Sequence, residues 1–269
     1  MRKYIGKNHA ALTAGLIIST VLLAAMIIGI FYTPYEPSQM NGAEKFTAPG
    51  IRHLMGTDNF GRDIFSRVLE GLRTTFFVAI SVTIIGSFFG VLLGAVTGYF
   101  GGILDEVLMR MNDALAAFPS ILLALVFISI LGSGKYNIIL ALGIIFIPSF
   151  ARIVRGEYIR QKELDYVKSA RLMGAGPFRV MFVHILPNIL PALLSAITVG
   201  FNNAVLAEAG MSYLGIGVQP PDASLGRMLS EAQGYLFSAP WYALCPGIVI
   251  ILLILGFSLI NEGMGEQHA

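Results

Sequence analysis

Side chains that commonly bind metals or act as nucleophiles are scarce and widely separated in this chain of 269 residues. The four histidines are His9, His53, His184 and His268. No two of them have the close spacing that lets neighbouring ligands hold one metal ion, so the sequence predicts no metal site. The single cysteine, Cys245, lies in an apolar run and is interpreted as a packing residue rather than a nucleophile or ligand.

The sequence also lacks the short motifs of common catalytic sites. It contains no Gly-x-x-x-x-Gly-Lys-Ser/Thr loop to hold nucleotide phosphates, no His-Glu-x-x-His and no Gly-x-Ser-x-Gly. An enzyme inside a membrane would need buried nucleophiles or metal ligands, whereas the apolar runs here offer mostly Asn, Ser and Thr. We therefore predict no catalytic residue, no bound cofactor and no ATP hydrolysis by the isolated chain.

One basic stretch, DYVKSARLMGAGPFRVMFVHILPN at residues 165–188, stands out in an otherwise apolar chain. Residues 166–173 suit a helix, which Gly174 ends because glycine adopts left-handed backbone angles at little cost. Pro177 can then begin a second helix. The pattern predicts a helix–turn–helix elbow joined to an apolar span. Such an elbow can transmit motion from a soluble partner, or lie on anionic lipid headgroups; physical reasoning alone leaves both open.

The elements that must position this elbow are long and apolar. The chain is 55% hydrophobic and only 13% charged, which is typical of membrane proteins. Six apolar runs are predicted to cross the membrane, at residues 10–32, 73–99, 115–131, 137–151, 185–207 and 241–260. The first run is longer than a signal-peptide core of about 7–15 residues, and no small-x-small cleavage pattern follows it. We therefore predict an uncleaved span.

Lys and Arg are distributed unevenly between the connecting segments. Residues 152–179 contain seven of them, whereas residues 207–240 contain only Arg227. Cytoplasmic loops carry the excess of Lys and Arg, so the first segment is predicted to be cytoplasmic and the second external. Six spans then place both termini in the cytoplasm. The net charge of +2 is too small to suggest a nucleic-acid partner.

The second span carries glycines at every fourth position: Gly86, Gly90, Gly94 and Gly98. This spacing puts all four on one helix face, where small residues let another helix approach closely in lipid. Tight packing within the subunit is the favoured interpretation. A surface that contacts the translocation path is the alternative.

Polar residues beside the spans allow two readings each. Residues 56–75 have the pattern of an amphipathic helix along the outer interface, which either bridges two spans or docks an external partner. Arg110 and Asp113 are spaced to form an ion pair on a helix. Charged residues this close to a span either have a functional role or belong to its first, solvent-exposed turns. Glu208 either faces a water-filled cavity or lies at the interface.

A second short amphipathic helix is predicted at residues 225–236, behind the turn-forming Gln-Pro-Pro-Asp of residues 219–222. Leu225, Met228, Leu229, Ala232 and Leu236 share one face. Arg227 and Glu231 lie elsewhere and are candidate contacts for an external partner protein. Simple packing over the bundle is nearly as good an interpretation.

The elbow resembles the signature cytoplasmic loop of permease subunits of ATP-binding-cassette importers. That loop reads Glu-Ala-Ala, three residues, Gly, nine residues, an apolar residue, any residue and Leu-Pro. The corresponding positions are Lys168, Ser169, Ala170, Gly174, His184, Leu186 and Pro187. The spacing matches, although Lys168, Ser169 and His184 depart from the usual residue types.

Further stretches resemble the branch of these importers that carries dipeptides, oligopeptides or nickel, specifically its second permease subunit. They are GTDNFGRDIFSR at residues 56–67, LMRMNDALAAFPSILLAL at 108–125, HILPN at 184–188 and MSYLGIGVQPPDASLGRML at 211–229. These matches follow the family's order along nearly the whole chain. Any one alone would be weak, but together they are strong.

The resemblance implies an all-α, type I importer permease fold with six transmembrane helices in a bacterial inner or plasma membrane. Residues 1–72 would form the first helix and an extracellular segment, residues 73–262 a five-helix permease domain and residues 263–269 a cytoplasmic tail. The chain would contact lipid and pair with a second permease subunit. Two cytoplasmic ATPases would bind the ATP, and an extracellular or periplasmic solute-binding protein would deliver cargo. The elbow would be the ATPase-coupling loop.

The resemblance leaves the cargo open among dipeptides, oligopeptides, nickel and metal–chelator complexes. The stretch AGMSYLGIGV at residues 209–218 and the chain length lean towards the nickel type, while few histidines and one cysteine favour a peptide or a chelated metal over a bare ion. An ion-coupled secondary transporter and a membrane scaffold are the rivals. The first often shows inverted repeats and broken helices, and no convincing repeat is visible here; the second would not need this elbow.

Overall fold

The computed structural model describes residues 2–265, and within this part of the chain the regular structure is helical, with no β-strand. Five helices are long and apolar enough to cross a membrane, and the bent pair α3–α4 makes a sixth crossing if it is counted as one span. The long helices are α1 (Arg2–Phe31), α2 (Ile64–Phe100), α5 (Lys135–Gln161), α8 (Leu186–Tyr213) and α10 (Pro240–Gly265). This confirms the all-α membrane fold.

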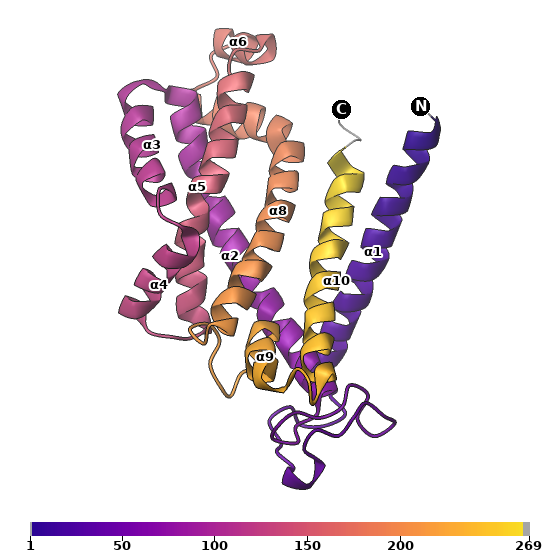
Figure 1. Cartoon of the computed structure of the whole chain (residues 1–269). Helices are drawn as coiled ribbons and strands as arrows, with labels where there is room; N and C mark the ends of the chain where they lie inside the picture. The colour runs from indigo at the N-terminus through magenta and orange to yellow at the C-terminus, as the bar shows by residue number, and fades with distance from the viewer. Residues whose placement is uncertain (1, 266–269) are drawn as a thin grey trace.

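Shorter helices lie between the long ones and at the two ends of the bundle. They are η1 (Gly42–Glu44), α3 (Gly102–Ala116), α4 (Ser120–Leu131), α6 (Asp165–Leu172), α7 (Pro177–Arg179), the π-helical turn η2 (Val180–Ile185), α9 (Leu225–Ala232) and η3 (Gln233–Tyr235). We call the end that carries α6 the elbow face. The opposite end, which carries α9 and residues 32–63, is the loop face (Figure 1).

Helix α2 corrects one prediction from the sequence. Residues 64–75 do not form a separate interfacial helix; they are the first three turns of a single helix of 37 residues. Asp63 begins it by accepting a hydrogen bond from the Ser66 N–H, and no proline interrupts it before Gly101. The predicted domain boundary between residues 72 and 73 therefore falls inside α2. A helix of this length spans about 55 Å, which exceeds the membrane core.

The third predicted span, residues 115–131, belongs to a bent pair of helices and is not a single straight helix. Helices α3 and α4 meet at an angle of 89° around residues 117–119. Pro119 explains the break, because proline lacks the N–H that a continuous helix needs and disfavours helical angles at the residue before it. Helix α4 alone, with 12 residues, is too short to cross a core of about 30 Å.

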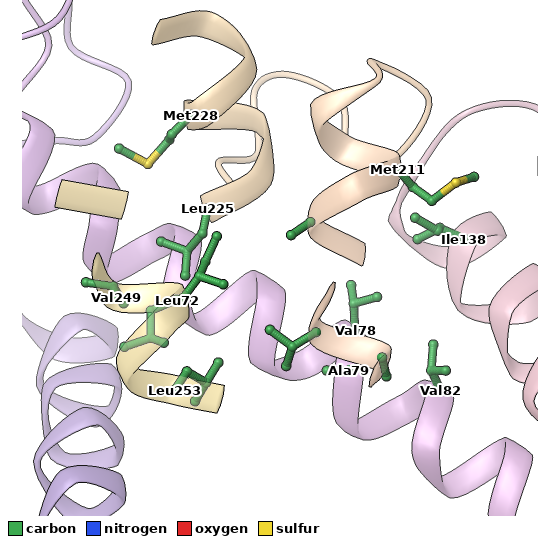
Figure 2. Packing of buried hydrophobic residues seen from close by; sticks show 14 of the residues in the cluster. Leu72, Val78, Ala79, Val82, Ile138, Met211, Leu225, Met228, Val249 and Leu253 are labelled. Carbon is green, nitrogen blue, oxygen red and sulfur yellow. The ribbon is translucent and has the colours of Figure 1, made fainter. Parts of the chain in front are cut away.

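The helices pack as two groups that share α2. Helix α5 packs most extensively on α2, while α1 packs along α10. Towards the loop face, a buried apolar cluster joins α2 to α9 and α10, where Leu72, Leu225 and Leu253 lie together (Figure 2). The predicted tail of residues 263–269 begins inside α10, and residues 266–269 lie outside the described part of the chain.

Candidate functional site

The elbow forms as its local sequence predicts. Helix α6 ends beside Gly174, which has a φ of +87°, and Pro177 occupies the first turn of α7. The Ala175 N–H donates back to the Ala170 carbonyl across the turn, which satisfies a carbonyl at the end of α6. From Pro177 onward, the chain runs without a break through η2 into α8. The turn is therefore attached directly to a membrane-spanning helix.

The base of the elbow is fixed to the bundle. Val167 of α6 and Val180, Met181 and Ile185 of η2 are buried in a cluster with residues of α2, α5 and α8, and Ala170 of α6 is also buried. The Tyr158 hydroxyl donates to the Met181 carbonyl over 3.0 Å, and Lys162 Nζ donates to the Gly98 carbonyl over 2.9 Å. Arg171 lies over the Tyr99 ring at 4.9 Å from its centroid. The base of the elbow is therefore packed against α2, α5 and α8.

The tip of the elbow is apolar and exposed. Leu172, Met173 and Phe178 are 89%, 83% and 72% exposed. Exposed apolar patches of this kind, rimmed by polar residues, are typical of surfaces that a partner covers. We call these three residues the tip.

The residues of the predicted coupling loop are distributed around this turn. Lys168 and Ser169 point outward, with Lys168 Nζ 3.8 Å from Asp165 Oδ1, while Ala170 is buried beneath them. Gly174 is exposed, and a Cβ built on it would meet no atom within 4 Å. Leu186 and Pro187 form the first turn of α8. The loop's six residues therefore cluster at the elbow, and the tip extends the surface beyond them.

The four glycines of α2 face helix α5. A Cβ built on Gly86, Gly90, Gly94 or Gly98 would lie between 2.4 and 2.8 Å from atoms of residues 146–158. No side chain larger than hydrogen fits at such distances, so the glycines let the two helix backbones approach closely. This is the arrangement that tight packing within one subunit requires.

A cavity of about 910 Å³ opens between α4, α5 and α8. We call it the groove. Its lining carries no charged residue and is mostly apolar; the polar side chains that line it are Ser120, Ser149, Ser195, Asn203 and Tyr213. Sites of this size with a few neutral polar groups bind ligands largely through apolar contact and hydrogen bonds.

The sequence interpretation did not assign the groove, although α8 carries a signal for it. Small or polar residues recur there every three or four positions, at Ala192, Ala196, Gly200, Asn203, Ala207 and Gly210. That spacing marks one face of a helix. The α5 wall is mostly large and apolar, like any buried helix face, and the place of the α4 wall depends on the bend between α3 and α4.

A network of charged side chains joins the start of α2 to α9 and α10 at the loop face. Glu231 Oε2 accepts hydrogen bonds from Arg62 Nη2 at 2.8 Å, from Arg67 Nη2 at 3.0 Å and from the Tyr242 hydroxyl at 3.0 Å. Its Oε1 accepts from Arg227 Nε at 3.2 Å. We call these five residues the loop-face network.

This network gives the Glu231 carboxylate partners within the chain on both oxygens. Glu231 stays partly exposed, and its contact with an external protein remains a prediction. Arg227 is partly exposed and still borders the surface. A contact between Arg227 and an external protein stays a prediction.

The charges of the network shift the pKa of Glu231. Burial by itself would raise the pKa of this carboxyl group, but the neighbouring Arg67 and Arg62, with hydrogen bonds from Tyr242 and Arg227, outweigh burial and hold the pKa below its ordinary value. The ionised form of Glu231 is therefore part of the folded structure.

The structure also tests the predictions made for Asp113 and Glu208. Asp113 pairs with Arg152 of α5 at 3.0 Å and not with Arg110, so the expected pair within one helix is wrong. Glu208 is fully buried rather than at the interface or in a water-filled cavity. Within residues 2–265, no group of His, Cys, Asp and Glu side chains is arranged to hold a metal ion.

The chain is similar to known transport proteins over most of its length. Residues 90–264 match the family described as binding-protein-dependent transport system inner membrane component. The dipeptide transport system permease protein DppC of Haemophilus influenzae is 38% identical over 269 aligned residues, which cover 98% of this chain and 91% of the relative. The glutathione transport system permease protein GsiD of Pectobacterium atrosepticum is 37% identical and is aligned over 97% of this chain and 86% of its own length.

A solved structure has the same fold. A chain from inward-facing conformations of the MetNI methionine ABC transporter superposes with a TM-score of 0.58, covering 75% of this chain and 94% of the other. The two sequences are 21% identical, so this likeness concerns the fold.

Proposed function

This chain belongs to the family of inner membrane components of binding-protein-dependent transport systems, and on that premise we propose that it forms half of a translocation pathway for short peptides. It is a multi-pass permease subunit of an ATP-driven importer and is not itself an enzyme. The pathway half is the groove between α4, α5 and α8. A second permease subunit supplies the other half.

Peptide is the proposed cargo because relatives of high coverage are named for dipeptide and glutathione transport. The lining of the groove is compatible with this assignment. Its hydroxyl and amide groups can exchange hydrogen bonds with a peptide backbone, and its apolar walls accept varied side chains. We therefore favour peptides over the nickel-type cargo towards which two sequence features lean.

The elbow is the proposed site of energy coupling, and the observation that carries this proposal is its two-sided construction. Its base is buried against three long helices, whereas its tip is exposed and apolar. A cytoplasmic ATPase that covers the tip can therefore push on the bundle through a rigid connection. The loop that transmits this motion consists of Lys168, Ser169, Ala170, Gly174, Leu186 and Pro187.

Closure of two ATP-bound ATPases would draw the elbows of the two permease subunits together and turn the pathway outward. A solute-binding protein would then release its peptide into the pathway, and hydrolysis would return the bundle to its inward state. This is alternating access driven by domain closure in partner proteins. ATP binds to these partners in the proposal.

We assign the elbow face to the cytoplasm. The seven Lys and Arg residues of positions 152–179 lie in α5 and the elbow, and cytoplasmic segments carry the excess of these residues. The start of α1 and the end of α10 lie at the same face as α6 (Figure 1), so both termini are assigned to the cytoplasm. Reporter fusions at the C-terminus and near Asp222 should give opposite locations.

Replacing Leu172 and Phe178 together with serine tests the coupling proposal. Loss of two apolar anchors should weaken ATPase binding by at least about 30-fold, with peptide uptake and substrate-stimulated ATP hydrolysis falling in the assembled importer. Ile51→Ser, which changes an exposed apolar residue at the loop face, is the matched control. Normal uptake by the double variant would show that the tip does not couple the ATPases.

A further inference from the structure

Glu208 is a buried carboxyl group for which the transport cycle outlined above has no role. It lies near the loop-face end of α8 and is 0% exposed. Its Oε1 accepts a hydrogen bond from the Ser212 hydroxyl at 2.6 Å. Within the described residues, its Oε2 is buried without a hydrogen bond, and no Lys, Arg or His forms an ion pair with the group. A buried carboxyl group is costly to retain, so its contacts indicate a role.

Ser212 connects Glu208 to the segment that follows α8. While its hydroxyl donates to Glu208, its oxygen accepts from the Val218 N–H at 3.1 Å. Gly217 lies so close that a Cβ there would collide with Ser212 Oγ. Ser212 and Val218 are both fully buried. Residues 214–218 are thus held to α8 through one hydroxyl group, and that hydroxyl is oriented by Glu208.

The same carboxyl group lies beside a second connection, between α2 and α9. The hydroxyls of Thr75 and Ser224 are its polar neighbours. Thr75 Oγ1 accepts from the Leu225 N–H at 3.3 Å, and Ser224 begins α9 by accepting from the Arg227 N–H. Next to them, Gly226 packs directly on the backbone of Ala209, where a Cβ would not fit. Glu208 therefore lies where α2, α8 and the start of α9 meet.

This junction lies next to the groove. The groove is lined by Gly210, Met211 and Leu214, which lie within two positions of Ser212 in the sequence. Met211 reaches across to Ile138 of α5, while Leu225 packs on α2 beside Leu72 (Figure 2). Residues 210–214, which include Ser212 and form the end of α8 with its capping residue, thus make the rim of the groove at the loop face. Loosening of the Ser212 connection would move that rim.

We propose that Glu208 is a positioning residue for transport, which holds the loop-face rim of the groove in place through Ser212 and the start of α9. It touches no cargo; it acts by orienting the Ser212 hydroxyl and, through it, residues 214–218. The required property is a hydrogen-bond acceptor of glutamate length at Oε1. The proposal rests on the groove being the pathway of the proposed function.

The test compares Glu208→Gln and Glu208→Ala in the complete importer in lipid nanodiscs or proteoliposomes. Glutamine keeps the length and the acceptor oxygen, whereas alanine removes both. Glu163→Gln is the matched control, because Glu163 is an exposed glutamate at the elbow face. A spin label on Leu214→Cys, in a Cys245→Ser background, reports the mobility of the rim independently of any cargo.

Glu208→Ala should lower dipeptide uptake by about fivefold or more, since loss of a buried hydrogen-bond partner changes a local equilibrium by at least that factor. The label should become mobile, while assembly and basal ATP hydrolysis stay unchanged. Glu208→Gln should keep uptake within about twofold of the parent and leave the label immobile, because the Oε1 acceptor remains.

Three results would overturn the proposal: normal uptake by an assembled Glu208→Ala importer, an immobile label in that variant, or loss of uptake in Glu208→Gln with an immobile rim. If Glu208→Ala does not assemble, Ser212→Ala removes the same connection with a smaller change in volume, and an immobile label in it would equally contradict the proposal. If the parent importer carries no peptide, the proposed cargo is wrong, but the label still tests the positioning role.

Discussion

The elbow face and the loop face differ in whether their main side chains find partners within the chain. At the elbow face, the tip exposes Leu172, Met173 and Phe178 above a buried apolar base. At the loop face, Glu231 holds Arg62 and Arg67 within the chain, and its two oxygens accept four hydrogen bonds in all. The elbow face thus presents its apolar tip directly above a buried base, while the loop face, which also exposes Ile51 and Phe237, pairs its charged groups within the chain.

This difference indicates that the two ends of a permease subunit can have different roles. An apolar tip gains free energy when another protein covers it, so it suits repeated contact with an ATPase. A network of paired charges that is mostly buried gains little from a new partner but is costly to break, so it suits a rigid joint. The loop-face network joins segments that lie far apart in sequence, since Arg62 and Glu231 are 169 residues apart.

The largest effect is expected from Gly174→Val in the elbow. Its φ of +87° is strained for a β-branched residue, and the strain, about 1–3 kcal/mol, would distort the turn although the space around it is open. Peptide uptake should fall by at least about fivefold while the protein stays in the membrane. Gly176→Val is the matched control, since Gly176 has a φ of −69° and equally open surroundings. Equal uptake by the two variants would remove the elbow from the coupling pathway.

Glu231→Gln should give the next largest effect, on stability rather than coupling. It removes one of the two carboxylates, Glu231 and Asp58, that lie beside both Arg62 and Arg67, which should cost about 2 kcal/mol because Asp58 still pairs with Arg62. The apparent Tm of the purified importer should fall. Glu163→Gln, at the elbow face, should leave it unchanged. A stable Glu231→Gln protein would show that the loop-face network is not the rigid joint inferred here.

Acid should weaken the loop-face network and not the elbow base. The pKa of Glu231 is lower in the folded chain than the value of about 4.3 for an unperturbed glutamate, so the unfolded state binds more protons as the pH falls. The stability from Glu231 is therefore present above about pH 4.3 and is lost as the pH falls through the folded-state pKa. Unfolding curves of the parent and Glu231→Gln should converge on acidification. A gap that stays constant to pH 3 would contradict this origin.

Arg227→Glu should have the smallest effect. Its guanidinium group is partly exposed and only 3.2 Å from Glu231 Oε1, so reversal perturbs one edge of the loop-face network. If α9 meets the binding protein, stimulation of ATP hydrolysis should fall a few-fold at low salt and recover at high salt, because rim charges mainly govern association rate. Basal hydrolysis should not change. Unaltered stimulation at low salt would place the docking surface elsewhere.

Local sequence rules were sufficient for the elbow and for α9. Gly174 and Pro177 specify a helix end and a helix start through their own backbone preferences. The four-residue spacing of the α2 glycines places them on one face whatever the neighbour is. The short helix after residues 219–222 begins at Ser224, whose side chain caps it. Each of these features depends on residues within a few positions of one another.

Features that depend on distant residues were missed or assigned differently. The amphipathic pattern of residues 64–75 fits both an interfacial helix and the start of a long helix. In the structure these residues start a long helix, because Ile64, Val68 and Leu72 are buried under α9 and α10. Asp113 has a partner on its own helix in sequence but finds Arg152 on α5 in the structure. The groove has no complete sequence signature, because three helices form it.

The sequence by itself determined that the chain is an all-helical membrane protein with a broken, basic elbow, since hydropathy and the backbone preferences of glycine and proline act locally. Only the tertiary structure decided that Glu231 pairs with Arg62 and Arg67, that Glu208 lies where α2, α8 and α9 meet, and that α4, α5 and α8 enclose a groove. The physical reason is that a charged or polar side chain is stabilised by whichever partner folding brings within hydrogen-bond distance. For Arg62 and Glu231, that partner lies at the other end of the chain.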